Sequence, residues 1–94
     1  MWVTELIWLP DVTEKLAAKH GLSVNEVEQV FLNGPRYYRI ERGHREGEDL
    51  YAAEGRSDGG RLLVVFFVRK RDYRGLVISA RDMYPSERRR YGRK

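Results

Sequence analysis

The stretch that decides the fold reads Leu62-Leu63-Val64-Val65-Phe66-Phe67-Val68. It is almost wholly apolar, so its side chains on both faces of a strand would avoid water. A strand of this kind has to lie where both faces are covered or nearly so. We therefore expect this segment at the centre of a β-sheet.

Turn signals on both sides predict the strands next to it. Ser57-Asp58-Gly59-Gly60 is a strong turn pattern that follows a strand expected at Leu50–Glu54. On the other side, Arg69–Gly75 turns the chain into a return strand at Leu76–Ala80. These segments predict a β-meander.

One further strand precedes the meander. Tyr38 and Ile40 alternate with Arg39 and Glu41, which predicts a strand with one wet face. The charged segment Gly43–Glu48 then forms the connecting loop.

The N-terminal third reads as a short strand followed by two helices. The apolar stretch Trp2–Leu9 predicts the strand, and Asp11-x-x-Glu14 is a capping-box pattern for a first helix that ends at Gly21. Ser23-Val24-Asn25-Glu26 is a second capping box, for a helix that Gly34-Pro35 stops.

A last helix is expected from Pro85 through Tyr91. The order predicts an α+β fold: an antiparallel β-sheet with the two N-terminal helices on one face and a C-terminal helix. Ninety-four residues fit a single domain, residues 1–94.

Composition excludes several classes of protein and site. No apolar run is long enough for a membrane span, and the N-terminus lacks the pattern of a signal peptide. The absence of cysteine excludes disulfides and thiolate–metal sites. We therefore expect a cytoplasmic protein without a cofactor.

Charge is distributed unevenly along the chain. Residues 1–35 carry two cations and five anions, whereas residues 36–94 carry 16 cations and nine anions, and 14 of the 18 cations are arginine. Arginine binds phosphate bidentately, so an anionic partner such as nucleic acid or an acidic protein is one interpretation. A solvated basic surface is the other.

Three arginines at strand ends are the best candidates for a site. Arg56 closes one strand, Arg61 opens the next, and Arg81 ends the last. Pairing as a meander would bring Arg56 or Arg61 near Arg81 on one face, where such a cluster can bind phosphate and stabilise the charge that develops during RNA cleavage. In the alternative interpretation, these arginines only pair with Glu46, Glu54 or Asp82.

Other candidates are weaker. Arg88, Arg89 and Arg90 make the last helix cationic, and this surface can meet RNA, an acidic partner or only water. The loop residues His44 and Glu46 are candidates for proton transfer. A metal bound by His44, Glu46 and Glu48 is disfavoured because ligands this few sit on one flexible loop. His20, at a helix end, is read as structural.

An ordered set of motifs resembles the BrnT toxin family. It comprises Trp8, Lys19-His20-Gly21, Val30-Phe31, Gly47-Glu48, Gly55 to Arg61, and Ile78-Ser79-Ala80-Arg81 followed by Glu87 and Tyr91. The resemblance covers roughly Trp8 to Tyr91.

The resemblance implies a fold similar to the RelE ribonuclease toxins and a ribonuclease that arrests translation. It also implies neutralisation by a DNA-binding BrnA-like antitoxin, with a dimer or a toxin–antitoxin heterotetramer as the expected assembly. Carried over by motif, Arg56 and Arg81 match functional basic positions, and His44 with Glu46 match the charged loop of the family.

The chain departs from the family pattern near its start. Leu9 follows Trp8 where an acidic residue is usual, and the first helix has Lys15 but no asparagine. Two hypotheses therefore stay open. The first is a metal-independent endoribonuclease toxin that uses His44, Glu46, Arg56, Arg61 and Arg81. The second is a non-catalytic basic module that binds RNA or docks the antitoxin.

Overall fold

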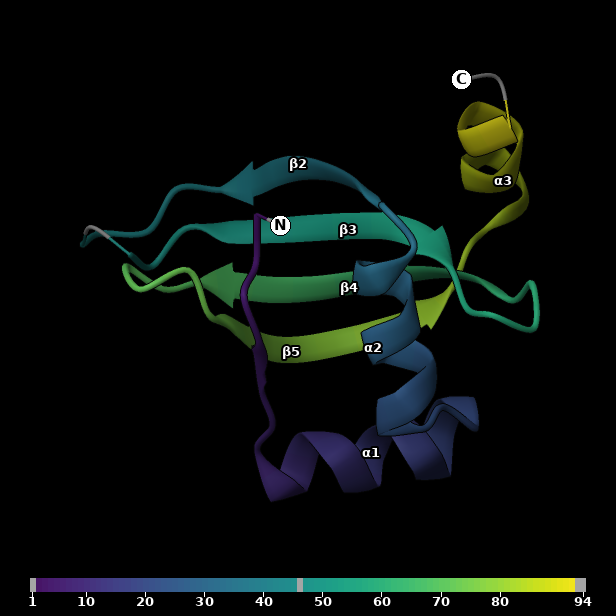
Figure 1. Cartoon of the computed structure of the whole chain (residues 1–94), viewed down its shortest axis with the longest axis horizontal. Helices are drawn as coiled ribbons and strands as arrows, with labels where there is room; N and C mark the ends of the chain where they lie inside the picture. Colours follow the sequence, from purple (N-terminus) through teal and green to yellow (C-terminus); the bar gives the residue numbers. More distant parts are fainter. Residues whose placement is uncertain (1, 46, 93–94) are drawn as a thin grey trace.

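The computed structural model describes residues 2–45 and 47–92. The elements follow the expected order of strand, two helices, meander and helix (Figure 1). They are β1 (Leu6–Ile7), α1 (Pro10–His20), α2 (Val24–Leu32), β2 (Arg36–Glu41), β3 (Leu50–Arg56), β4 (Leu62–Arg69), β5 (Gly75–Asp82) and α3 (Pro85–Gly92). Within the described residues, none of these helices has the length and apolarity needed to cross a membrane.

The two N-terminal helices start differently. The capping box of α2 is confirmed, because the Glu26 N–H donates to Ser23 Oγ at 3.1 Å and the Ser23 N–H donates to Glu26 Oε1 at 3.1 Å. The capping box predicted for α1 at Asp11 is wrong. That helix begins at Pro10, whose fixed φ suits the first helical position, and Leu9 is an N-cap without a side-chain bond.

The sheet has the order β1-β5-β4-β3-β2, so the apolar stretch that begins at Leu62 is central, as expected. Strands β2 to β5 pair antiparallel. The expected antiparallel sheet is therefore confirmed, with one parallel pair added at its edge, where β1 pairs with β5. A parallel pair needs a long connection, and here two helices and three strands lie between the two partners.

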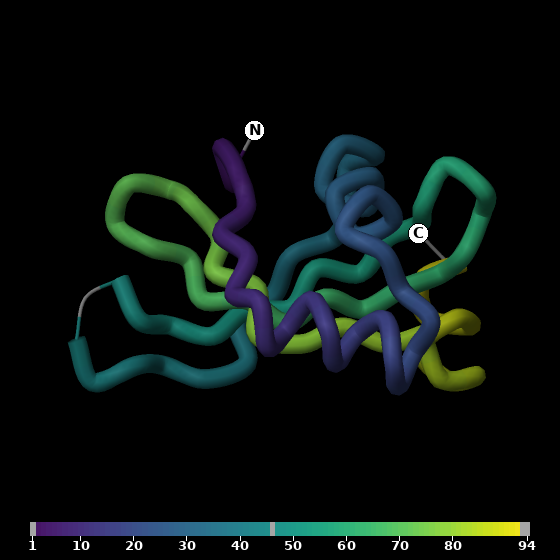
Figure 2. The backbone as a smooth tube through the Cα atoms, turned by 90° about the horizontal axis from the view of Figure 1, so that it is seen from below, coloured from purple at the N-terminus to yellow at the C-terminus, as the bar shows by residue number. Residues whose placement is uncertain are grey.

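The larger core lies between the sheet and the N-terminal helices. Leu63, Val65 and Phe67 of β4 point into it and meet Leu16 of α1 and, from α2, Val27, Val30 and Phe31. Gly55 allows α2 to approach β3, because a Cβ there would stand 3.1 Å from side-chain atoms of Val30 and Pro35. We call this side of the sheet the helix face. The N-terminal segment and α2 rise together from it (Figure 2).

The opposite side of the sheet, which we call the α3 face, carries a smaller core. Ala52, Val64 and Met83 are buried there, and Phe66 and Tyr91 pack against them. Helix α3 has no buried residue and covers only one end of this face (Figure 1). The rest of the α3 face is left for other contacts.

Candidate functional site

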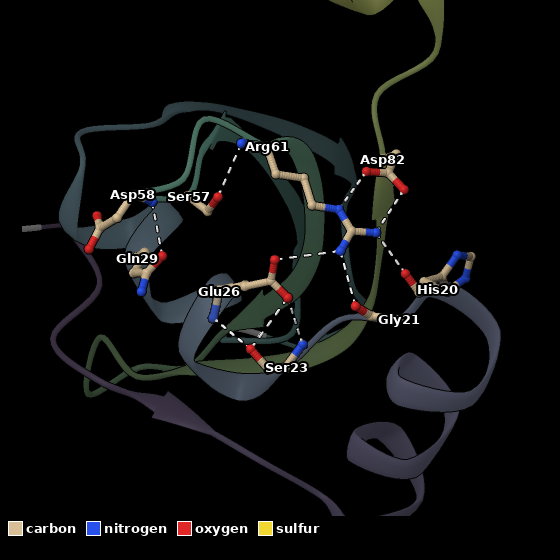
Figure 3. A network of polar contacts seen from close by, with 9 residues as sticks. All are labelled: His20, Gly21, Ser23, Glu26, Gln29, Ser57, Asp58, Arg61 and Asp82. Carbon is tan, nitrogen blue, oxygen red and sulfur yellow. Dashed lines mark hydrogen bonds and ion pairs between the residues drawn. The ribbon is translucent and has the colours of Figure 1, made fainter.

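Arg61 lies on the helix face and serves as a bridge between distant elements (Figure 3). Its Nε and Nη2 donate to the two carboxylate oxygens of Asp82 at 2.8 and 3.0 Å. The same guanidinium donates to the carbonyls of His20 and Gly21 at 2.7 and 3.0 Å, and Glu26 stands 3.5 Å away. All four partner residues belong to the protein itself.

This network holds the α1–α2 junction against the end of β5. The two carbonyls at the end of α1 accept hydrogen bonds from a cationic group. A positive charge at a helix C-terminus is stabilising, because it interacts favourably with the helix dipole. Asp82 completes the pair, and the hydrogen bond from Arg61 lowers the pKa of its carboxyl. The expectation that Arg61 gathers with Arg81 is therefore wrong.

Arg81 lies on the α3 face. It is paired with Val64 in the sheet register, whereas Asp82 is paired with Leu63, so these adjacent residues project to opposite faces. The Arg81 guanidinium donates to both oxygens of Glu87 at 2.7 and 3.0 Å. It also stacks over the exposed ring of Tyr84 at 3.9 Å and lies 5.5 Å from the Phe66 ring.

Beside Arg81, a buried carboxylate meets a second arginine of α3. Glu54 is fully buried, and its Oε2 accepts from Arg90 Nη2 at 2.7 Å and from the Tyr38 hydroxyl at 2.9 Å. Burial, together with the hydrogen bond to Glu54, raises the pKa of Tyr38 to about 12. Glu54 Oε1 has no partner among the described residues.

Together these side chains form one surface, which we call the α3 cluster. It consists of Tyr38, Glu54, Arg81, Tyr84, Glu87 and Arg90. The sheet contributes a carboxylate and a guanidinium, and α3 supplies the opposite charge to each. Both charge pairs therefore hold α3 on the sheet.

Arg56 has a register that supports part of the predicted arginine arrangement. It is paired with Leu62, and Leu62 shares the α3 face with Val64, the partner of Arg81. Arg56 is exposed. Arg56 and Arg81 thus flank β4 on one side of the sheet, while Arg61 lies on the other.

The predicted RNA-binding residues of α3 do not act alike. Arg90 points at Glu54, whereas Arg88 and Arg89 are exposed and form no ion pair with a side chain in the described part of the chain, although the charge of Arg88 helps to lower the pKa of Asp82. Of these three arginines of α3, Arg88 and Arg89 therefore remain available for an anionic partner.

The structure separates His44 from the arginines. His44 lies in the loop between β2 and β3, where Glu41 is paired with Leu50, and Arg56 closes the far end of β3. The seven residues of β3 span about 20 Å. The predicted joint site of His44 with Arg56 and Arg81 is wrong for that reason, and Glu46 lies outside the described residues.

The chain's other histidine, His20, lies at the end of the sheet where the arginines are. The pKa of Asp82 is lowered first by Arg61 and also by the charges of His20 and Arg88.

The α3 cluster adds Glu54, Tyr84 and Glu87 as site residues that sequence reasoning had not proposed. The sequence had indicated Glu54 only as a possible ion-pair partner of the arginines, and strand alternation places it on the same side as Arg56.

The chemistry available at the α3 cluster is that of charge stabilisation. Among the described residues, no three histidine or carboxylate side chains gather in a way that could hold a metal ion. Arg81 can instead contact a phosphate through its Nε–H and the second hydrogen of Nη2, because Glu87 takes only one hydrogen from each Nη. The exposed Tyr84 ring offers a surface on which an unpaired base can stack.

Comparisons with known proteins identify the relatives of this chain. Residues 8–87 match the protein family described as the ribonuclease toxin BrnT of type II toxin–antitoxin systems. The crystal structure of the Brucella abortus ribonuclease toxin BrnT is similar, with a TM-score of 0.63 and 22% identity, over 85% of this chain and 96% of that one. This likeness shows a shared fold. No curated protein matches the sequence.

Proposed function

Because the chain belongs to the BrnT family of ribonuclease toxins of type II toxin–antitoxin systems, we propose that it cleaves RNA without a metal ion, at the α3 cluster. The observation that carries this proposal is the placement of Arg81. Its guanidinium lies on the face that the N-terminal helices leave open, stacked at 3.9 Å on the exposed ring of Tyr84. A phosphate and its neighbouring base can meet these two groups together.

The proposed reaction is attack by the 2′-hydroxyl on the adjacent phosphorus. The hydroxyl loses its proton as the new P–O bond forms, and the bond to the 5′-oxygen breaks when that oxygen takes up a proton. The intermediate phosphorus centre carries extra negative charge. Arg81, supported by Arg56 on the same face, stabilises that charge.

Proton transfer needs a second group close to Arg81. Glu87 is the carboxylate in direct contact with the guanidinium, and the hydrogen bond from Arg81 lowers the pKa of Glu87, so the carboxylate is ionised at neutral pH. An ionised carboxylate can accept the 2′-hydroxyl proton, although a lowered pKa makes it a weak base. Charge stabilisation therefore supplies most of the proposed rate enhancement.

The test is cleavage of total RNA by the purified chain in EDTA. We expect cleavage by the parent, and a loss of roughly 10²–10³-fold in rate for Arg81→Ala. Arg39→Ala is the matched control, because Arg39 is also a strand arginine near a carboxylate, Asp49 at 3.6 Å, but its pairing with Tyr51 places it on the helix face, away from the α3 cluster. Intact RNA, or equal rates for the parent and Arg81→Ala, overturns the proposal.

A second candidate function is that of a non-catalytic basic module. The observation in its favour is that Arg61, Arg81 and Arg90 each already pair with a carboxylate of the same chain. Binding of RNA that falls steeply with salt, without cleavage, would distinguish this function from catalysis.

Membership of a type II toxin–antitoxin family implies an antitoxin partner and RNA as the substrate. We propose further that the protein acts in the cytoplasm and assembles with a BrnA-like antitoxin into a heterotetramer, with a dimer as the alternative. Sedimentation of the purified complex measures that stoichiometry directly.

A further inference from the structure

A groove of about 320 Å³ opens on the helix face, between the N-terminal segment and α2. Its lining includes Val3, Glu5 and Leu6 from the N-terminal segment and Glu28, Phe31 and Leu32 from α2. Figure 2 shows these two segments standing side by side above the sheet. The groove therefore lies on the opposite side of the sheet from the α3 cluster.

The groove has an apolar lining. Val3 and Phe31 are buried at 1% and 5% exposure, and Leu6 is half-buried. Leu32 stands at the rim with 70% of its surface exposed, more than any other large apolar side chain described. Leu32 and the groove lining thus form one contiguous apolar surface, and such surfaces mark sites of protein–protein interaction.

The charge around the groove is negative. Glu5 and Glu28 are both exposed, and neither makes an ion pair within the described part of the chain. The N-terminal 35 residues carry two cations and five anions, in contrast to the basic remainder. A polyanion such as RNA is repelled here, whereas a cationic segment is attracted.

The backbone at the groove can also accept a partner. Among the described strands, β1 is the last at its edge of the sheet, and its one neighbour is β5. The carbonyl of Glu5 accepts from the Gly75 N–H at 2.9 Å, so in a parallel pair the N–H and carbonyl of Leu6 point away from β5. An extended segment can hydrogen-bond to that free edge.

We propose that this groove binds an extended segment of the antitoxin in which a large apolar side chain is flanked by lysine or arginine. The identity of the partner rests on the toxin assignment, while the chemistry of the segment rests on the groove alone. Toxin and antitoxin would then meet on the helix face, and the α3 cluster would remain the RNA-cleaving side.

The test compares binding to the antitoxin, produced from the reading frame adjacent to this gene, by fluorescence anisotropy. Leu32→Arg places a cation at the apolar rim and should weaken binding at least tenfold. Glu28→Lys should weaken binding and reduce its salt dependence. Leu9→Arg is the matched control, because Leu9 is also exposed, at 45%, and does not line the groove.

The Leu32→Arg variant should fold, because an arginine at the C-terminal end of α2 suits the helix dipole. RNA cleavage by Leu32→Arg should equal that of the parent, so a lost interaction with retained cleavage supports the groove. A parent that fails to cleave RNA would contradict the proposed function and leave the binding measurement intact.

A photo-crosslinker in place of Leu32 identifies the contacted segment. Crosslinking to an apolar residue between basic residues supports the proposal. Crosslinking to an acidic segment, equal binding by Leu32→Arg and the parent, or loss of RNA binding in Leu32→Arg overturns it. Self-association of the chain that disappears in Leu32→Arg also overturns it, because the occupant is then a second copy.

Discussion

Arg61 and Arg81 reach the same end of the sheet from opposite faces. Arg61 joins Asp82 to the carbonyls at the end of α1, whereas Arg81 joins the sheet to Glu87 of α3. Two arginines that look equivalent in sequence thus have different neighbours. Substitution of Arg61 should therefore lower the stability of the fold, whereas substitution of Arg81 should lower the rate of RNA cleavage.

Arg61→Lys should lower the free energy of unfolding by about 1–3 kcal/mol. Lysine keeps the charge but cannot donate to Asp82 and to the carbonyls of His20 and Gly21 in the same geometry. Urea unfolding measures the change. Arg74→Lys is the control, because the partner of Arg74 is Asp72, two residues away in its own turn. Lost cleavage with unchanged stability would instead place Arg61 in the RNA site.

The pairing of Glu54 with Arg90 predicts a mutational rescue. Arg90→Ala should lower the thermal midpoint, because it leaves the buried carboxylate of Glu54 with only the Tyr38 hydroxyl. Adding Glu54→Gln should recover much of the loss, since the amide carries no charge. Arg89→Ala, on the same helix and exposed, should leave the midpoint unchanged. No recovery in the double variant would refute the prediction.

Acid should loosen both arginine pairs. The pKa values of Asp82 and Glu87 are lowered in the folded protein, chiefly by hydrogen bonds from Arg61 and Arg81. A lowered folded pKa contributes stability that is complete above the unfolded pKa, near 4, and is lost as pH falls through the folded value.

Urea midpoints between pH 7 and pH 3 measure this loss. Asp82→Asn and Glu87→Gln should each flatten the fall at the acid end, while Glu14→Gln, an exposed change on α1, should leave it as in the parent. Identical acid profiles for all four proteins would contradict the assignment of the two pairs.

His44→Ala should leave the rate of RNA cleavage unchanged within a factor of about two. The corresponding change in activation free energy is well below the ~1.4 kcal/mol of a tenfold change in rate. The reason is distance, because the β2–β3 loop and Arg81 lie at opposite ends of the sheet (Figure 1). Single-turnover cleavage rates for His44→Ala and the parent provide the measurement. A loss comparable to that of Arg81→Ala, with unchanged stability, would restore the catalytic role predicted for His44.

The sequence by itself determined the elements and their order. The capping box at Ser23, the turn at Ser57 to Gly60 and the apolar run from Leu62 are local signals, because each depends on residues a few positions apart. The C-terminal helix at Pro85 and the central place of β4 follow from the same kind of pattern. The family resemblance also rests on linear motifs and agrees with the match over residues 8–87.

Only the tertiary structure decided which side chains share a face. Alternation puts Arg81 and Asp82 on opposite faces, but which face each residue takes is set by the register of β5 on β4. The partners of the arginines come from far along the chain, 41 residues for Arg61 and His20 and 36 for Arg90 and Glu54. Local patterns carry no record of such contacts, because packing of whole elements creates them.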